Sequence, residues 1–312
     1  MRRLVRIAIA LALLTTFAIP TAFAQTQKKV GLVTINLQAL FFNQINDGAK
    51  KAAAENNVDL TIVDGNNDPA RQVQAIEDFI TQKMDAIVVV AIDVEGIKPA
   101  VQDARDAGIP VVAIDAKVAV PPANGFIGVD NYGAGVEAGA YTLGFVQGAL
   151  NGAAKVGIVG ALNSFIQNQR KDGFTETVKA NPGIDVVGVV DGQNVQEVAL
   201  TAAENLVTAN PDMNVIYATG EPALIGVIAA VQSQGVQDRV KVIGWDLTKQ
   251  AIQAIDAGYV TAVVQQNPYE EGYQAVLASL KLAAGQSVPE ETLIPITIVT
   301  KYNVDQYRSL FQ

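Results

Sequence analysis

Short, almost wholly aliphatic segments recur along the chain, and they constrain the fold more than any other feature. Examples are "VGLVTI", "AIVVVAI", "KVGIVG", "VIYAT" and "VTAVVQ". A strand that is apolar on both faces needs cover on both faces, which is typical of a parallel sheet between helices. Amphipathic stretches separate these segments. In "DPARQVQAIEDFITQK", Val73, Ile76 and Phe79 share one helical face, and Asp68 and Pro69 mark its start. The repeated alternation predicts a doubly wound α/β fold.

The first 24 residues have the form of a secretory signal peptide. Arg2, Arg3 and Arg6 precede an apolar run, and Ala22-Phe23-Ala24 resembles a cleavage site before Gln25. A retained membrane anchor is the alternative, but the apolar run is short for a span of about 20 residues. Because the chain has no cysteine, it cannot carry a lipid on an N-terminal cysteine. We expect a periplasmic protein that is not lipid-anchored.

Composition excludes several classes of function. Removing the three signal-peptide arginines from the 22 basic residues leaves 19 against 31 acidic residues, a net charge of −12. Such a surface repels nucleic acid. With neither histidine nor cysteine, Ser-His-Asp and Cys-His catalysis and most zinc chemistry are excluded. Phosphate-loop, dinucleotide and nucleophile-elbow motifs are missing as well. We expect no cofactor, no metal and no catalytic residue. An exported hydrolase that uses a carboxylate pair is the enzyme alternative.

The length of the mature chain favours two lobes. About 290 residues exceed what one hydrophobic core serves. A break falls near "VDNYGAG" at residues 129–135, where a second set of strands begins. No Ser-, Gly- or Pro-rich linker is present, so short crossing segments would join the lobes.

Many of the predicted strands end in an apolar residue followed by aspartate. These residues are Asp64, Asp93, Asp115, Asp130, Asp191 and Asp246. Ligands of open parallel sheets bind outside the carboxyl ends of the strands, so such acceptors could face a crevice. Alternatively, each aspartate caps a helix or closes a turn. Glycine follows Asp64 and Asp191, which favours the turn. For Asp115 and Asp246 we favour contact with a ligand.

An ordered set of segments resembles one family. The segments are "FFNQINDGAKKAAAE", "IPVVAID", "IGVDN", "GFTETV", "NLVTANPD", "VIYATGEPALIGV" and "VIGWD". Together they are similar to the sugar-type periplasmic solute-binding proteins of ABC importers, the ribose-binding group in particular, over nearly the whole mature chain. The resemblance implies a type I periplasmic binding protein. Its two Rossmann-like lobes would be joined by a three-segment hinge near Val129, Gln266 and Pro295, and would close on one ligand. The N-terminal lobe would comprise 25–129 plus 267–295, and the C-terminal lobe 130–266 plus 296–312.

The resemblance also implies site residues. Phe41 and Phe42 match paired aromatics that flank a sugar ring, although either could belong to the core. Asp115 and Asp246 match acidic acceptors of ligand hydroxyls, and Gln266 matches an amide at the hinge. Ionised carboxylates form strong hydrogen bonds with hydroxyls, and an amide both donates and accepts.

Departures from the ribose group point to a different ligand. Ala116, followed by Lys117, stands where an arginine is usual, and Asn168 aligns with another arginine, with Arg170 close by. Asn194 takes the place of an aromatic residue. Gln38 and Ala39 replace asparagines, and Gly220, followed by Glu221, replaces one more. Because arginine and an amide are not interchangeable, we expect another monosaccharide, a polyol or a cyclitol instead of ribose.

The sequence therefore predicts a monomeric receptor that passes this ligand to the membrane permease subunits of an ABC importer. A sensor for a membrane kinase or chemoreceptor is the alternative. Asn168 and Asn194 could instead be surface amides, and whether Lys117 or Arg170 enters the pocket stays open. The candidate ligand-binding residues are Asn36, Gln38, Phe41, Phe42, Asp115, Asn168, Asn194, Glu221, Asp246 and Gln266.

Overall fold

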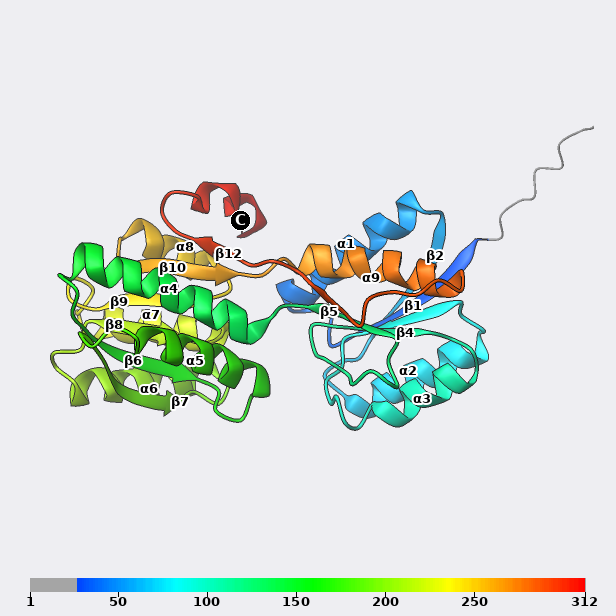
Figure 1. Cartoon of the computed structure of the whole chain (residues 1–312), viewed down its shortest axis with the longest axis horizontal. Coiled ribbons are helices and arrows are strands. Elements are labelled where there is room, and N and C mark those ends of the chain that lie inside the picture. The colour runs from blue at the N-terminus through cyan, green and yellow to red at the C-terminus, as the bar shows by residue number, and fades with distance from the viewer. Residues whose placement is uncertain (1–26, 312) are drawn as a thin grey trace, which may run out of the picture.

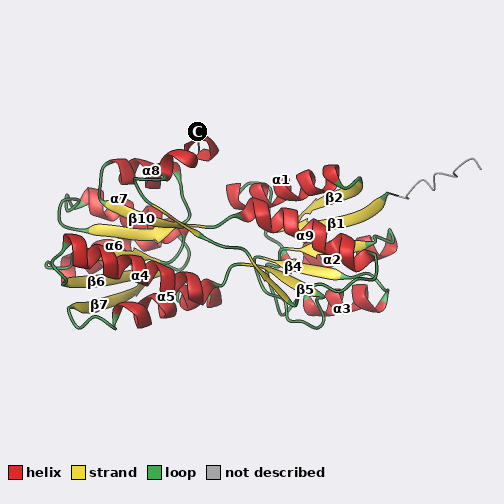
Figure 2. Ribbon diagram, turned by 45° about the horizontal axis from the view of Figure 1, so that its top comes forward, coloured by secondary structure: helices red, strands yellow, loops and turns green. Residues whose placement is uncertain are grey.

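The computed structural model describes residues 27–311, and the predicted signal peptide lies outside the described residues. Two six-stranded sheets lie apart along the long axis of the molecule, each with helices on both faces (Figures 1 and 2). Extended segments connect the two bodies (Figure 1). The α/β fold predicted from the strand–helix alternation is confirmed.

The first sheet has the order β11-β5-β4-β3-β1-β2, and all its neighbouring strands pair in parallel. Its strands are β1 (Lys28–Thr34), β2 (Val58–Asp64), β3 (Ala86–Val89), β4 (Val111–Ile114), β5 (Gly125–Gly128) and β11 (Glu291–Leu293). One face packs on α1 (Leu40–Glu55) and α9 (Pro268–Ala283), the other on α2 (Pro69–Thr81) and α3 (Lys98–Asp106). This sheet and its four helices form what we call the first lobe.

The second sheet has the order β12-β10-β9-β8-β6-β7 and is parallel except for the antiparallel pair β10–β12. Its strands are β6 (Ala154–Gly160), β7 (Ile184–Asp191), β8 (Val215–Ala218), β9 (Lys241–Trp245), β10 (Val260–Gln265) and β12 (Thr297–Val299). Helices α4 (Asn131–Ala149) and α5 (Phe165–Val178) cover one face. The other face carries α6 (Gln196–Ala209), α7 (Glu221–Ser233) and α8 (Lys249–Asp256), together with 3-10 turns at Val304–Gln306 and Arg308–Phe311. These elements form the second lobe.

The two sheets repeat one arrangement, in which β1 to β5 correspond to β6 to β10 in sheet order. The chain passes between the lobes after β5, after β10, and between β11 and β12. Both sheets also present the carboxyl ends of their parallel strands toward the gap between the lobes (Figure 2). Strand-end residues of both lobes therefore face one cleft.

Close helix pairs fix the elements that border this cleft. A Cβ atom on Gly272 of α9 would lie 1.9 Å from the carbonyl oxygen of Ile45 in α1. In the second lobe, a Cβ atom on Gly135 of α4 would lie 2.3 Å from the carbonyl oxygen of Arg170 in α5. Only glycine permits such approaches. The starts of α9 and α5 are thereby held rigidly at the cleft.

Helix starts follow the sequence signals where those are strong. Asp68 accepts a hydrogen bond from the Ala70 amide at the start of α2, as its position before Pro69 predicts. Within residues 27–311, no helix has both the length and the apolar character needed to cross a membrane.

Candidate functional site

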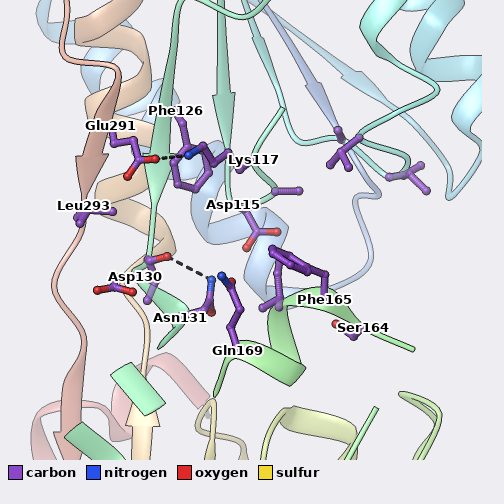
Figure 3. Close-up of a pocket in the computed structure, with 16 residues that line it drawn as sticks. Asp115, Lys117, Phe126, Asp130, Asn131, Ser164, Phe165, Gln169, Glu291 and Leu293 are labelled. Atoms are coloured by element: carbon purple, nitrogen blue, oxygen red, sulfur yellow. Dashed lines mark hydrogen bonds and ion pairs between the residues drawn. The ribbon is translucent and has the colours of Figure 1, made fainter. Parts of the chain in front are cut away.

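A cavity of about 560 Å³ lies between the lobes (Figure 3). Asp115, Lys117 and Phe126 line it from the first lobe. Asn131, Phe165 and Gln169 line it from α4 and α5 of the second lobe, and Glu291 and Leu293 lie at its edge. The close-up shows side chains from both lobes directed into one space (Figure 3). This cavity is where a small ligand would contact both lobes.

The six strand-end aspartates fall into two groups. Four of them accept hydrogen bonds from backbone amides of a nearby turn or helix start: Asp64, Asp93, Asp130 and Asp191. The turn predicted for Asp64 and Asp191 is thus confirmed. Within residues 27–311, neither Asp115 nor Asp246 caps a helix or accepts from a turn amide. Asp246 is bonded to the side chain of Gln266, whereas Asp115, which lines the cavity, has no side-chain partner.

Asp115 and Asp246 occupy equivalent places, after β4 and after β9. Both have left-handed backbone conformations, with φ values of 60° and 59°. The Asp246 carboxylate accepts from Gln266 Nε2 at 3.0 Å to each oxygen, whereas Asp115 accepts no side-chain hydrogen bond within residues 27–311. Burial raises the pKa of Asp115 to about 6 although part of the residue stays accessible, and Arg170 opposes this rise. Burial also raises the pKa of Asp246.

Arg170 provides a positive charge at the floor of the second lobe. The residue is 6% exposed, and its guanidinium lies 3.6 Å from the centre of the Trp245 ring. Its Nε donates to Asn131 Oδ1 at 2.8 Å, Nη1 to the carbonyl oxygen of Thr219 at 3.2 Å, and Nη2 to Gln266 Oε1 at 3.4 Å. Arg170 lies behind Asn131, which lines the cavity, whereas Lys117 lines the cavity itself and pairs with Glu291.

An amide network continues from this floor. Gln167 Oε1 accepts from Thr219 Oγ1 at 2.8 Å, and Gln167 Nε2 donates to Asn194 Oδ1 at 2.8 Å. A Cβ atom on Gly220 would lie 2.8 Å from Gln167 Nε2, so glycine gives Gln167 its space. Asn194 is therefore tied into the second-lobe network, together with Asp246 and Gln266.

Two predicted residues of the second lobe lie outside this network. Asn168 Nδ2 donates to the carbonyl oxygen of Leu162 at 2.8 Å, which fastens the loop after β6. Glu221 is the first residue of α7 and is exposed.

The predicted residues of the first lobe are less closely connected. Phe41 and Phe42 contact each other edge to face, with ring centres 5.4 Å apart, and both are half-buried against the first-lobe core. Neither lines the cavity of Figure 3. Asn36 Oδ1 accepts from the amides of Gln38 and Ala39, so it shapes the turn before α1, and Gln38 is exposed.

Gln167, Asn131 and Phe165 were not predicted from the sequence. Asn131 accepts from Arg170, and Gln167 links Thr219 to Asn194. No local sequence pattern distinguishes such a linking amide from a surface amide. Phe165 follows Ser164, a helix-start residue, and its exposure in the cleft becomes visible only in three dimensions. Among the described residues, no group of three or more acidic side chains is arranged to hold a metal ion.

Comparison with known proteins places this geometry in a family. A model of the periplasmic binding protein domain matches residues 30–287. The chain belongs to the periplasmic binding protein family. Its resemblance to ribose-binding proteins, seen in the sequence, is confirmed, and so is the type I fold.

Three relatives illustrate the match. The ribose import binding protein of Escherichia coli (strain K12) is 27% identical over 301 residues, which cover 96% of this chain and 99% of that protein. An arabinose-binding protein from Geobacillus stearothermophilus has a TM-score of 0.83 at 26% identity, covering 90% of this chain and 99% of that one. A solute-binding protein from Bacillus halodurans C-125 with bound myo-inositol has a TM-score of 0.79 at 26% identity, covering 91% and 98%.

Proposed function

We propose that this periplasmic binding protein captures a small, neutral, polyhydroxylated ligand between its lobes and delivers it to an ABC permease. The ligand class comprises monosaccharides, polyols and cyclitols. One observation carries the proposal: Asp115 and Asp246 stand at equivalent strand ends of opposite lobes, and neither is used to close a turn or cap a helix.

The chemistry of the two acids suits hydroxyl groups. An ionised carboxylate accepts from a hydroxyl in a charge-assisted hydrogen bond. Gln266 and Arg170 supply donors beside Asp246, and an amide can serve a hydroxyl both as donor and as acceptor. A site with acceptors and donors of this kind holds a ligand that has several hydroxyls and no charge of its own.

The placement of the acids in different lobes gives binding a consequence for conformation. Asp115 belongs to the first lobe and Asp246 to the second, so a ligand that bonds both favours the closed arrangement. The three crossings after β5, after β10 and between β11 and β12 would act as the hinge. We keep 25–129 plus 267–295 and 130–266 plus 296–312 as the proposed bounds of the moving lobes.

Transport fits the family better than catalysis, because the relatives are named as binding proteins. We further propose that residues 1–24 direct export and that the protein acts unanchored in the periplasm as a monomer. The relatives compared above are named for ribose or arabinose, or hold myo-inositol, so the identity of the ligand varies within the family. Ala116 and Asn168, where the ribose group has arginine, point away from ribose.

A ligand panel tests the proposal. Purified mature protein is heated in the presence of individual monosaccharides, alditols and cyclitols, and each hit is measured by isothermal titration calorimetry. A true ligand at one hundred times its Kd should stabilise the protein by about 2.7 kcal/mol.

Two variants make this test specific. Asp246→Ala should lower the affinity strongly and leave the fold intact. Asp64→Ala removes a strand-end aspartate that closes a turn away from the cavity, so it should leave the affinity unchanged. Absence of any thermal shift or heat across the whole panel would refute the proposed function, and an unchanged affinity in Asp246→Ala would refute the role of that residue.

A further inference from the structure

Phe165 has an unusual position for a large apolar side chain. It is the first residue of α5 and is 76% exposed, whereas Phe174 on the same helix is fully buried. An exposed phenylalanine gains nothing from the folding of its own lobe, because its ring stays in water. The packing of the second lobe therefore does not account for Phe165.

The ring lies at the cleft between the lobes. Phe165 lines the same cavity as Asp115 of the first lobe, and Figure 3 shows both side chains directed into that space. Gln169, one helical turn further along α5, lines the cavity too. One face of the first turns of α5 thus presents an aromatic ring and an amide to the space opposite Asp115.

The position of this ring is fixed by the elements behind it. Ser164 Oγ accepts from the Gln167 amide at 3.3 Å and caps α5. A Cβ atom on Gly173 of α5 would lie 2.2 Å from the carbonyl oxygen of Tyr132, so α5 rests directly on the α4 backbone. Phe165 is consequently presented by a rigid helix start and not by a free loop.

Other aromatic residues are not available in the same way. Trp245 and Tyr217 of the second lobe are fully buried and hydrogen-bonded to each other. At residue 194, where the ribose group has an aromatic, stands an asparagine tied to Gln167. Phe126 and Phe165 are the aromatic residues that line the cavity among residues 27–311, and Phe126 is 5% exposed. Phe165 is thus the aromatic ring with most of its surface free to meet a ligand there.

We propose that Phe165 is the second lobe's aromatic contact for the ligand and determines a preference for cyclic ligands over open-chain ones. This inference rests on the proposed function. The C–H groups on a face of a sugar or cyclitol ring form an apolar surface that an aromatic ring can cover. In the closed protein, Phe165 covers that face while Asp115 accepts from hydroxyls at the rim. An open-chain polyol offers no such flat face.

The test compares ring and chain ligands in matched variants. Calorimetry measures the Kd of a cyclic ligand found in the panel and of an open-chain alditol with the same number of carbons. We expect Phe165→Ala to weaken the cyclic ligand about 10- to 100-fold, the effect of losing one buried phenylalanine contact. The alditol should be weakened much less. Phe165→Leu, which keeps apolar bulk without a flat ring, should show an intermediate loss for the cyclic ligand.

Controls separate this role from general effects. Tyr302→Ala removes an aromatic that is 86% exposed and does not line the cavity, so it should leave both affinities unchanged. Phe165→Ala should also keep the melting temperature of the ligand-free protein, since the ring is exposed.

Each other outcome is decisive. Wild-type affinity in Phe165→Ala would overturn the contact. An equal loss for ring and chain ligands would overturn the proposed preference. Failure of the wild-type protein to bind any panel member would refute the proposed function itself, and this inference with it.

Discussion

Replacing Asp115 by asparagine should stabilise the ligand-free protein and weaken ligand binding. Burial raises the pKa of Asp115 to about 6 from its usual value of 3.8. Each pKa unit corresponds to about 1.36 kcal/mol, so holding this carboxylate ionised at neutral pH costs up to about 3 kcal/mol. Because Asp115 is partly accessible, water screens the charge, and we expect about 1–2 kcal/mol.

The sign of the pH dependence follows from the raised pKa. Below pH 3.8 the carboxyl is protonated in both the folded and the unfolded chain, so Asp115 costs nothing relative to asparagine. Between pH 3.8 and about 6, the unfolded chain has lost the proton that the folded chain still holds. The wild-type protein therefore loses stability relative to the variant as the pH rises through this range to about 6. At pH 7.5 the gain in Asp115→Asn should raise Tm by about 2–4 °C per kcal/mol for a lobe of this size.

Binding should change in the opposite direction. A charge-assisted hydrogen bond to a hydroxyl contributes about 1.5–3 kcal/mol, so losing the charge should weaken the ligand by about 10- to 150-fold. Differential scanning calorimetry of the ligand-free protein at pH 4 and pH 7.5, with titration calorimetry at pH 7.5, measures both effects.

Asp64→Asn is the matched control for this variant. The asparagine oxygen can still accept from the Asn66 amide, and Asp64 does not line the cavity, so stability and affinity should both stay close to the wild-type values. If Asp115→Asn were less stable than the wild-type protein at pH 7.5, or if its gain were the same at both pH values, the reasoning about the desolvated carboxylate would be wrong.

Three further predictions concern the same structure. The affinity of the wild-type protein should be constant above pH 7 and decline as the pH falls through about 6, because protonated Asp115 no longer accepts as an anion. Calorimetry in a series of buffers measures this dependence, and a constant affinity from pH 7.5 to 5 would contradict it. Arg170→Lys should lower the free energy of unfolding by about 2–3 kcal/mol and weaken binding, because lysine cannot both stack on Trp245 and donate to Asn131. Chemical unfolding measures the loss, and full retention of stability would contradict this role of Arg170. Gly272→Ala should destabilise the first lobe by more than about 2 kcal/mol, since its Cβ would lie 1.9 Å from the Ile45 carbonyl oxygen. Gly144 has nothing within 4 Å of a Cβ atom, so Gly144→Ala should stabilise α4 by about 0.5–1 kcal/mol. Similar Tm values for both variants would contradict the close approach of α1 and α9.

The strands could be predicted from the sequence because most of them are buried on both faces. "AIVVVAI" contains β3 and "VTAVVQ" is β10, since a covered parallel strand has no polar face to obscure the pattern. β11 could not be predicted. Its three residues, "ETL", expose Glu291 and Leu293 at the sheet edge, so local composition carries no strand signal.

The part of the candidate site that could be predicted from the sequence is the part marked by an aspartate directly after a strand. Six strand-end aspartates are visible in the sequence, and a following glycine correctly indicated the turns at Asp64 and Asp191. Asn36 takes part in the turn before α1, where its Oδ1 accepts from two backbone amides, and its contact with a ligand stays a prediction. Neither the burial of Arg170 over Trp245 nor the exposure of Phe165 follows from neighbouring residues, because each depends on how α5 sits on α4.

The backbone at Asp115 and Asp246 strengthens the case for a ligand. Both residues adopt φ near +60°, where glycine would be least strained, and both have carboxylates whose pKa is raised by burial. Aspartate tolerates this backbone conformation, but its buried carboxylate carries an electrostatic cost that neither residue offsets by capping a helix. The same choice recurs at equivalent strand ends of two lobes. At Asp115, whose carboxylate has no side-chain partner within residues 27–311, folding alone would be served better by glycine or asparagine, and this supports the proposed contact with a ligand in the cleft.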